Sequence, residues 1–177
     1  MSNYRSIISE LENKFKQLIR EQTEDTAELI GCPYPYTTPG RDKNNALFYW
    51  DTYFINLGLL RLKNLEQARH NAENLISLQK RFGFVPASTH KSFLRHSQIP
   101  LLPWIIRDVY RATGDKEWLN RMLPDVINEF KYWTTKPHTS PSGLYRYAAP
   151  TFDEADQHAE SESCSLQSAR FQNAGQY

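Results

Sequence analysis

The sequence FYWDTYF, residues 48–54, sets five aromatic side chains around one carboxylate, Asp51. Aromatic residues are only moderate helix formers, so a helix does not need such a run. Their rings form flat apolar surfaces with polar edges, beside which a carboxylate can accept hydrogen bonds from hydroxyl groups. Sugars combine apolar C–H faces with rims of hydroxyls. We therefore expect this segment to face a carbohydrate pocket.

Helical periodicity extends on both sides of this segment. Apolar residues recur at helical spacing over 6–22, 47–63, 64–82, 99–113, 115–123 and 124–133. Gly83 and Gly114 are placed to end two of these helices. Asp115 is placed to cap the next helix, and Pro124 to begin the last one in its first turn. The pattern predicts an all-α chain with about six helices.

Long loops alternate with short links along the chain. Residues 23–46, 83–98 and those from 134 onward lack helical period, whereas the links near 63–64 and 114 are short. Paired helices with their long loops at one end are typical of an (α/α)6 toroid, of which this chain would form a part. We expect one partial barrel domain over 1–177. It would be helical over 6–133, with a short strand at 144–147 and a polar tail. An ordinary helical bundle is the alternative.

Composition excludes several classes of function. The formal net charge is +1 and no basic face stands out, so we expect no nucleic-acid partner. No apolar run approaches the roughly 18 residues of a membrane span, so we expect no membrane partner. Residues 1–20 lack the apolar core of a secretory signal, and the cytoplasm is the expected compartment.

The sequence also indicates neither a disulfide nor a metal site. Cys32 and Cys164 lie far apart, and two cysteines alone do not make a zinc site. The histidines are not spaced as a metal-binding set. We expect no metal and no other cofactor.

Several motifs resemble the trehalase family of glycoside hydrolases. PGR at 39–41 followed by FYWDTYF at 48–54 resembles its first signature, a Pro-Gly-Gly-Arg turn before an aromatic-Trp-Asp-x-Tyr run. FGFVP at 82–86 and SQIP at 97–100 resemble its second stretch. Residues 115–133 resemble the helix pair that follows. Bacterial glucosidases and mannosylglycerate hydrolases share these features, so the clan is better supported than the substrate.

The resemblance covers roughly residues 33–163 and implies an (α/α)6 barrel. It implies an enzyme that hydrolyses a small α-linked glycoside such as trehalose, with inversion and without a redox cofactor. Trp50 would lie on a sugar face and Asp51 would bind hydroxyls; a core Trp and a turn-capping Asp are the plainer alternatives. The implied substrate contacts are Trp50, Asp51, Tyr49, Gln98, His96 and Arg41.

Three departures from the family pattern concern the sugar preference. The place of the signature arginine holds Lys43, with Arg41 two residues earlier, and the second glycine is missing. His96 replaces the arginine before Ser-Gln, and a lone His is more often structural than a ligand contact. A relative with a different sugar preference fits these changes.

Glycoside hydrolysis needs two carboxyl groups. The acidic cluster at 153–162 offers carboxylates, although a solvated loop is the plainer interpretation. The resemblance implies a general acid within Glu-Ser-Gly-Trp-Asp-x-Ser-x-Arg-aromatic. Residues 162–163 and 168–171 match the ends of this motif, but the place of the acid falls on Leu166, which cannot donate a proton. The family's base would lie beyond Tyr177.

We therefore expect no complete catalytic pair and a truncated chain that is inactive alone. The alternatives are a non-catalytic helical sugar-binding or scaffold module, or a truncated product without function. The expected partner is a small carbohydrate, and the sequence leaves the oligomeric state open.

Overall fold

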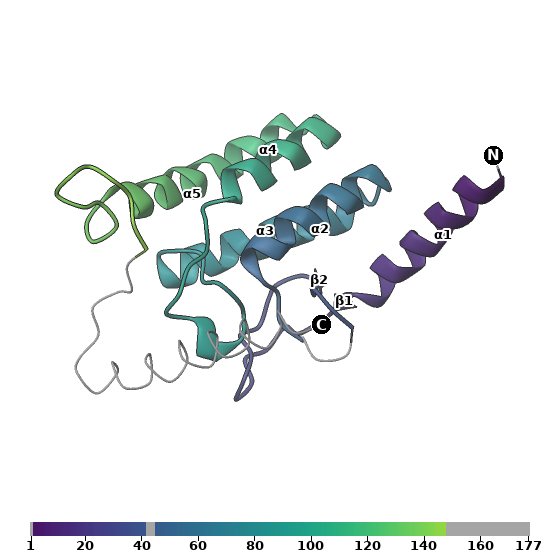
Figure 1. Cartoon of the computed structure of the whole chain (residues 1–177), viewed down its shortest axis with the longest axis horizontal. Helices are drawn as coiled ribbons and strands as arrows, with labels where there is room; N and C mark the ends of the chain where they lie inside the picture. Colours follow the sequence, from purple (N-terminus) through teal and green to yellow (C-terminus); the bar gives the residue numbers. More distant parts are fainter. Residues whose placement is uncertain (1, 42–44, 148–177) are drawn as a thin grey trace, which may run out of the picture. The chain divides into compact units, whose positions relative to one another are not determined.

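A computed structural model of the chain describes residues 2–41 and 45–147. These ranges hold five α-helices, one short 3₁₀ helix and a two-stranded antiparallel sheet (Figure 1). The elements are α1 (Ser2–Gln17), β1 (Ile19–Arg20), β2 (Tyr36–Thr37), α2 (Tyr49–Arg61), α3 (Leu65–Phe82), η1 (Lys91–Phe93), α4 (Leu102–Thr113) and α5 (Lys116–Thr134). The all-α class is confirmed. Among the described residues, none of the helices has the length and apolar character needed to cross a bilayer.

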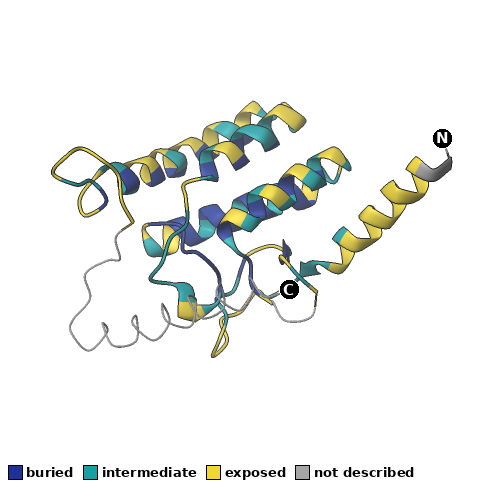
Figure 2. Cartoon of the chain, in the orientation of Figure 1, coloured by how far each residue is buried: buried dark blue, intermediate teal, exposed yellow. Residues whose placement is uncertain are grey.

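Helices α2 to α5 form two packed hairpins. Residues 62–64 join α2 to α3, and residues 114–115 join α4 to α5, whereas 83–101 separate the two hairpins. Helix α3 contacts α2, α4 and α5, and α4 also contacts α2. Each of these helices contributes buried residues to the core, and those stretches of ribbon are dark blue in Figure 2. Paired helices with short links at one end agree with one part of an α/α toroid.

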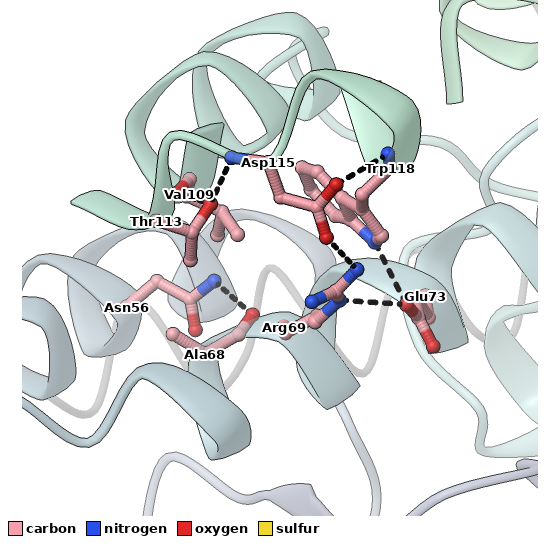
Figure 3. Close-up of polar contacts among 8 residues, drawn as sticks. All are labelled: Asn56, Ala68, Arg69, Glu73, Val109, Thr113, Asp115 and Trp118. Carbon is pink, nitrogen blue, oxygen red and sulfur yellow. Dashed lines mark hydrogen bonds and ion pairs between the residues drawn. The ribbon is translucent and has the colours of Figure 1, made fainter. Parts of the chain in front are cut away.

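Polar contacts fix the link between α4 and α5. Gly114 adopts the left-handed conformation that ends α4, and the Asp115 carboxylate accepts the Trp118 backbone N–H at 2.8 Å. Arg69 of α3 donates to the same carboxylate at 2.7 Å, and the Trp118 indole donates to Glu73 at 2.7 Å (Figure 3). This end of the second hairpin is thereby tied to α3.

The expected break at Pro124 is wrong. Helix α5 runs through Pro124, although a proline removes one intrahelical hydrogen bond. Burial along both halves of the helix, from Trp118 to Trp133, holds it as a single element. Its buried face also differs from the apolar pattern, because Ile127 and Phe130 are 52% and 65% exposed.

Helix α1 spans Ser2–Gln17 and not 6–22. The apolar face expected for this helix is not covered: Ile7, for example, is 49% exposed. The contact of α1 with α2 comes from Phe15, whose ring lies against Gly58. The remaining predicted residues, from 18 to 22, include strand β1, because this backbone pairs with β2. Amphipathic spacing thus identified the helix but not which of its sides is covered.

Three amide side chains of α3 hold the proline-rich loop. Asn74 accepts the Tyr34 backbone N–H at 3.1 Å and donates to the Tyr34 carbonyl at 3.0 Å. Gln67 donates to the Pro35 carbonyl at 2.9 Å, and Asn71 accepts the backbone N–H of β2 at 3.0 Å. These bonds fix the described part of the loop on α3.

Residues 134–147 contain no named strand in the described range. The expected strand at 144–147 is represented by one isolated bridge between Thr139 and Tyr145. A turn at residues 141–142 lies between the two bridge partners, so only a short stretch on each side is left for pairing.

Candidate functional site

The candidate site lies at the start of α2, where the 83–101 loop meets it. The Leu47 backbone N–H donates to the Thr89 hydroxyl at 3.0 Å. The Thr89 backbone N–H donates in return to the Leu47 carbonyl at 3.0 Å. The Tyr49 backbone N–H donates to the Ala87 carbonyl at 3.0 Å. The chain is therefore fixed to this loop immediately before the residues expected to bind a ligand.

Trp50 and Gln98 meet directly, although 48 residues separate them. The Gln98 side-chain oxygen accepts the Trp50 backbone N–H at 2.7 Å. This bond satisfies one of the N–H groups that the first turn of a helix leaves without a partner, since the N-cap Phe48 provides no side-chain acceptor. The Gln98 amide nitrogen is then the end of this side chain suited to donate to a ligand. The Trp50 residue is 42% exposed.

Asp51 follows in the first turn of α2 and is partly buried. Burial raises the pKa of its carboxyl, and hydrogen bonds from its own backbone amide and the Trp50 side chain oppose this rise. The helix N-terminus also favours a negative charge here. Asp51 is therefore an acceptor beside an exposed indole, which is the combination expected for a sugar contact.

Tyr49 is a correction to the expected ligand contacts. Its side chain is fully buried. Its hydroxyl accepts the Leu102 backbone N–H at 2.7 Å and donates to Glu129. Its hydroxyl is thus already bonded inside the protein, which leaves no polar group of this side chain for a sugar.

Glu129 is the residue of this region that no sequence motif indicated. It is 1% exposed, and burial raises the pKa of its carboxyl to about 7. It lies one helical turn before the buried Trp133, so an acid on the buried side of α5 was the available signal.

His96 and Arg41 have different surroundings. The His96 backbone carbonyl accepts the Ala87 N–H at 2.6 Å, and its Nδ1 is buried without a hydrogen-bond partner among the described residues. Arg41 is exposed and donates to Gln17 at 2.5 Å, at the end of α1. The structure joins Trp50 to Gln98 and places Arg41 among other neighbours.

A cleft of about 430 Å³ opens beside the residues that follow Gln98. The Trp133 and Tyr147 rings in its wall pack edge to face, with centroids 5.6 Å apart. Such a wall suits an apolar ring face rather than a charged group. The lining residues are Ile99, Pro100, Phe130, Trp133, Thr134, Tyr145, Arg146 and Tyr147.

Some predicted features lie outside the described residues. These are Lys43, the acidic cluster at 153–162, Cys164 and Leu166. Cys32 is a buried free thiol whose pKa is raised to about 12 by burial. Within the described ranges no group of three His, Cys, Asp or Glu side chains is arranged to hold a metal ion.

Comparison with known proteins connects this geometry to a family. The family model named Trehalase matches residues 1–176. A probable trehalase of Oryza sativa subsp. japonica is 32% identical over 114 residues, which cover 64% of this chain and 20% of that protein. A trehalase of Tenebrio molitor is 34% identical over 123 residues, covering 70% of this chain and 22% of that protein.

A solved structure agrees with these relatives. The neutral trehalase of Saccharomyces cerevisiae superposes with a TM-score of 0.59 at 26% identity, over 75% of this chain and 27% of that one. The chain spans about a fifth of the length of the two curated relatives named above. Because the family match extends over almost every residue, the chain belongs to the trehalase family.

Proposed function

We propose that this chain is part of a trehalase-type O-glycosyl hydrolase of carbohydrate metabolism, acting on a small α-linked glycoside such as trehalose. The observation that carries the proposal is the 2.7 Å bond between the Trp50 amide and the Gln98 side chain. It links the two segments that resemble the family's signatures, residues 48–54 and 97–100. Residues 1–177 would supply one wall of a sugar pocket in a partial barrel domain.

Each proposed contact follows from the chemistry of its side chain. The exposed Trp50 indole stacks on the apolar face of a sugar ring. Asp51 accepts hydrogen bonds from hydroxyls, and the Gln98 amide nitrogen donates one. His96 and Arg41 are further contacts on the margin of the pocket.

The chain alone is proposed to lack hydrolytic activity. An inverting mechanism requires one carboxyl to protonate the leaving oxygen and a second to activate water. The place of the general acid is occupied by Leu166, whose side chain carries no ionisable proton. Release of glucose from trehalose by the purified chain would contradict this proposal.

Isothermal titration with trehalose, glucose and mannosylglycerate tests the pocket. Hydrogen bonds to a charged group contribute about 1.5–3 kcal/mol, so Asp51→Ala is expected to weaken binding by about tenfold or more. Glu66→Ala is the matched control, because Glu66 is also an acid in a first helical turn, on the exposed surface of α3. The pocket proposal fails if the unmodified chain binds none of these sugars, or if Asp51→Ala leaves binding unchanged.

A non-catalytic helical sugar-binding or scaffold module is the second candidate. It is favoured by Leu166 at the place of the acid. It predicts sugar binding with no turnover even after Leu166→Asp. The second candidate is rejected if Leu166→Asp hydrolyses trehalose.

The compartment and partners complete the proposal. We propose the cytoplasm, and neither a nucleic-acid nor a membrane partner; the formal net charge of +1 without a basic face supports the lack of a nucleic-acid partner. Curated relatives include a periplasmic trehalase of Xanthomonas campestris, so cell fractionation is the appropriate test.

A further inference from the structure

A buried polar connection joins α2, α4 and α5 behind the candidate site. The Tyr49 hydroxyl donates to the Oε1 atom of the Glu129 carboxyl and accepts the backbone N–H of Leu102, the first residue of α4, at 2.7 Å. Tyr49 and Leu102 are 0% exposed and Glu129 is 1% exposed. The connection spans 80 residues of sequence from α2 to α5.

Tyr49 is the first residue of α2, directly before Trp50 and Asp51. Successive helical residues project at fixed angular steps of about 100°. The orientation of the Tyr49 side chain therefore sets the directions in which the next two side chains leave the helix. Its backbone N–H is also bonded, to Ala87, so the first turn is fixed from two sides.

A carboxyl at position 129 is costly for packing alone. A buried polar group loses free energy unless it is hydrogen-bonded, and an apolar side chain of similar volume would fill the space more cheaply. The Glu129 Oε2 atom has no hydrogen-bond partner among the described residues, whereas Oε1 is bonded to Tyr49. The bond to the Tyr49 hydroxyl is thus the interaction that distinguishes this acid from a leucine.

We propose that Glu129 is a positioning residue of the sugar site, which acts through the Tyr49 hydroxyl to fix the first turn of α2 and the directions of Trp50 and Asp51. This inference rests on the proposed function, because it assigns the support of the same pocket. Glu129 itself touches no sugar, since it has almost no exposed surface.

The test uses the full chain with three variants. Glu129→Leu removes the acceptor, Tyr49→Phe removes the hydroxyl, and Glu129→Gln keeps a carbonyl oxygen that can accept the Tyr49 hydrogen bond. Asp125→Leu is the matched control: Asp125 is 5% exposed, lies one turn earlier on α5 and pairs with Lys80 at 3.3 Å.

Two measurements are made on each variant. Hydrogen exchange of the Trp50 amide, followed by NMR and corrected for global stability, reports on the first turn without any ligand. Calorimetry reports the Kd for trehalose. Loss of the bond is expected to speed exchange and to weaken binding by about three- to tenfold in Glu129→Leu and Tyr49→Phe. Glu129→Gln should stay within about twofold of the unmodified chain, as should Asp125→Leu.

The outcomes separate this inference from the proposed function. If the unmodified chain does not bind trehalose, the proposed function fails and the exchange data alone decide the positioning role. The inference is overturned if Tyr49→Phe leaves Trp50 exchange unchanged, if Glu129→Gln behaves like Glu129→Leu, or if Asp125→Leu has the same effect. Tyr49→Phe decides the question if Glu129→Leu does not fold.

Discussion

The stability of the chain should depend on pH through Glu129. Burial raises the pKa of this carboxyl from 4.5 to about 7, against a lowering effect of the Tyr49 hydrogen bond. Between these values the folded state holds a proton that the unfolded state releases. The stabilisation is therefore fully present below about pH 4.5 and is lost as the pH rises through about 7. At about 1.4 kcal/mol per pH unit, this difference corresponds to about 3 kcal/mol.

Urea unfolding, followed by tryptophan fluorescence, measures this loss. The free energy of unfolding is compared between the unmodified chain and Glu129→Gln at about pH 5 and about pH 8. Asp25 and Asp115 have lowered pKa values, mainly through hydrogen bonds from Arg81 and from the Trp118 backbone respectively. Their stabilisation is present above about pH 3.8 and is lost only in more acidic solution, so it is constant in this window.

Subtracting the Glu129→Gln curve isolates the carboxyl. We expect the difference in unfolding free energy between the two proteins to shift by most of 3 kcal/mol, with the unmodified chain losing relative stability at high pH. A difference that is the same at both pH values would show that Glu129 is already ionised near pH 5. The assignment of a buried, largely protonated acid would then be wrong.

Two further substitutions test the scaffold. Asn71→Ala removes buried hydrogen bonds to the Thr37 amide, to the Thr37 hydroxyl and to Asn56. In urea unfolding this variant should lose about 2–4 kcal/mol of unfolding free energy. Unchanged stability would contradict the packing of β2 on α3. Trp118→Phe keeps an aromatic ring but loses the 2.7 Å bond to Glu73. This variant should lower the free energy of unfolding by about 1–2 kcal/mol without changing the trehalose Kd. A raised Kd would show that the Trp118 end of the α4–α5 hairpin influences the sugar site, contrary to our expectation.

Local chemistry explains which parts of the fold the sequence predicted. Gly83 and Gly114 end helices in the left-handed conformation, and Asp115 caps α5, as expected from residue type and neighbouring sequence. Pro124 was misleading because a proline inside a helix lowers the stability of the helix but need not end it. In α5, packing on both sides of the proline outweighs one missing hydrogen bond.

The candidate site was only partly predictable for a related reason. Trp50 and Gln98 were both identified, but the bond between a side-chain oxygen and a backbone N–H follows from the path of the 83–101 loop. The buried Tyr49 hydroxyl bonds to Glu129, 80 residues away, and a run of aromatic residues does not indicate which ring is buried. Sequence patterns identified the aromatic and polar residue types, and long-range contacts then determined their orientations.

The amides of α3 extend this argument from the site to the loops that frame it. Gln67, Asn71 and Asn74 occupy buried positions that a hydrophobic pattern counts as surface. They are buried because a proline-rich loop has few regular backbone partners, and its N–H and C=O groups must be satisfied by side chains when the loop packs on a helix. The Tyr34 amide and carbonyl both bond to Asn74, so a single side chain replaces the partner that a neighbouring strand would supply. A run of buried amides facing an irregular segment is therefore evidence that the segment has a fixed position on the helix. In this chain the amides of α3 hold the proline-rich loop against the same helical hairpin that carries Trp50 and Asp51.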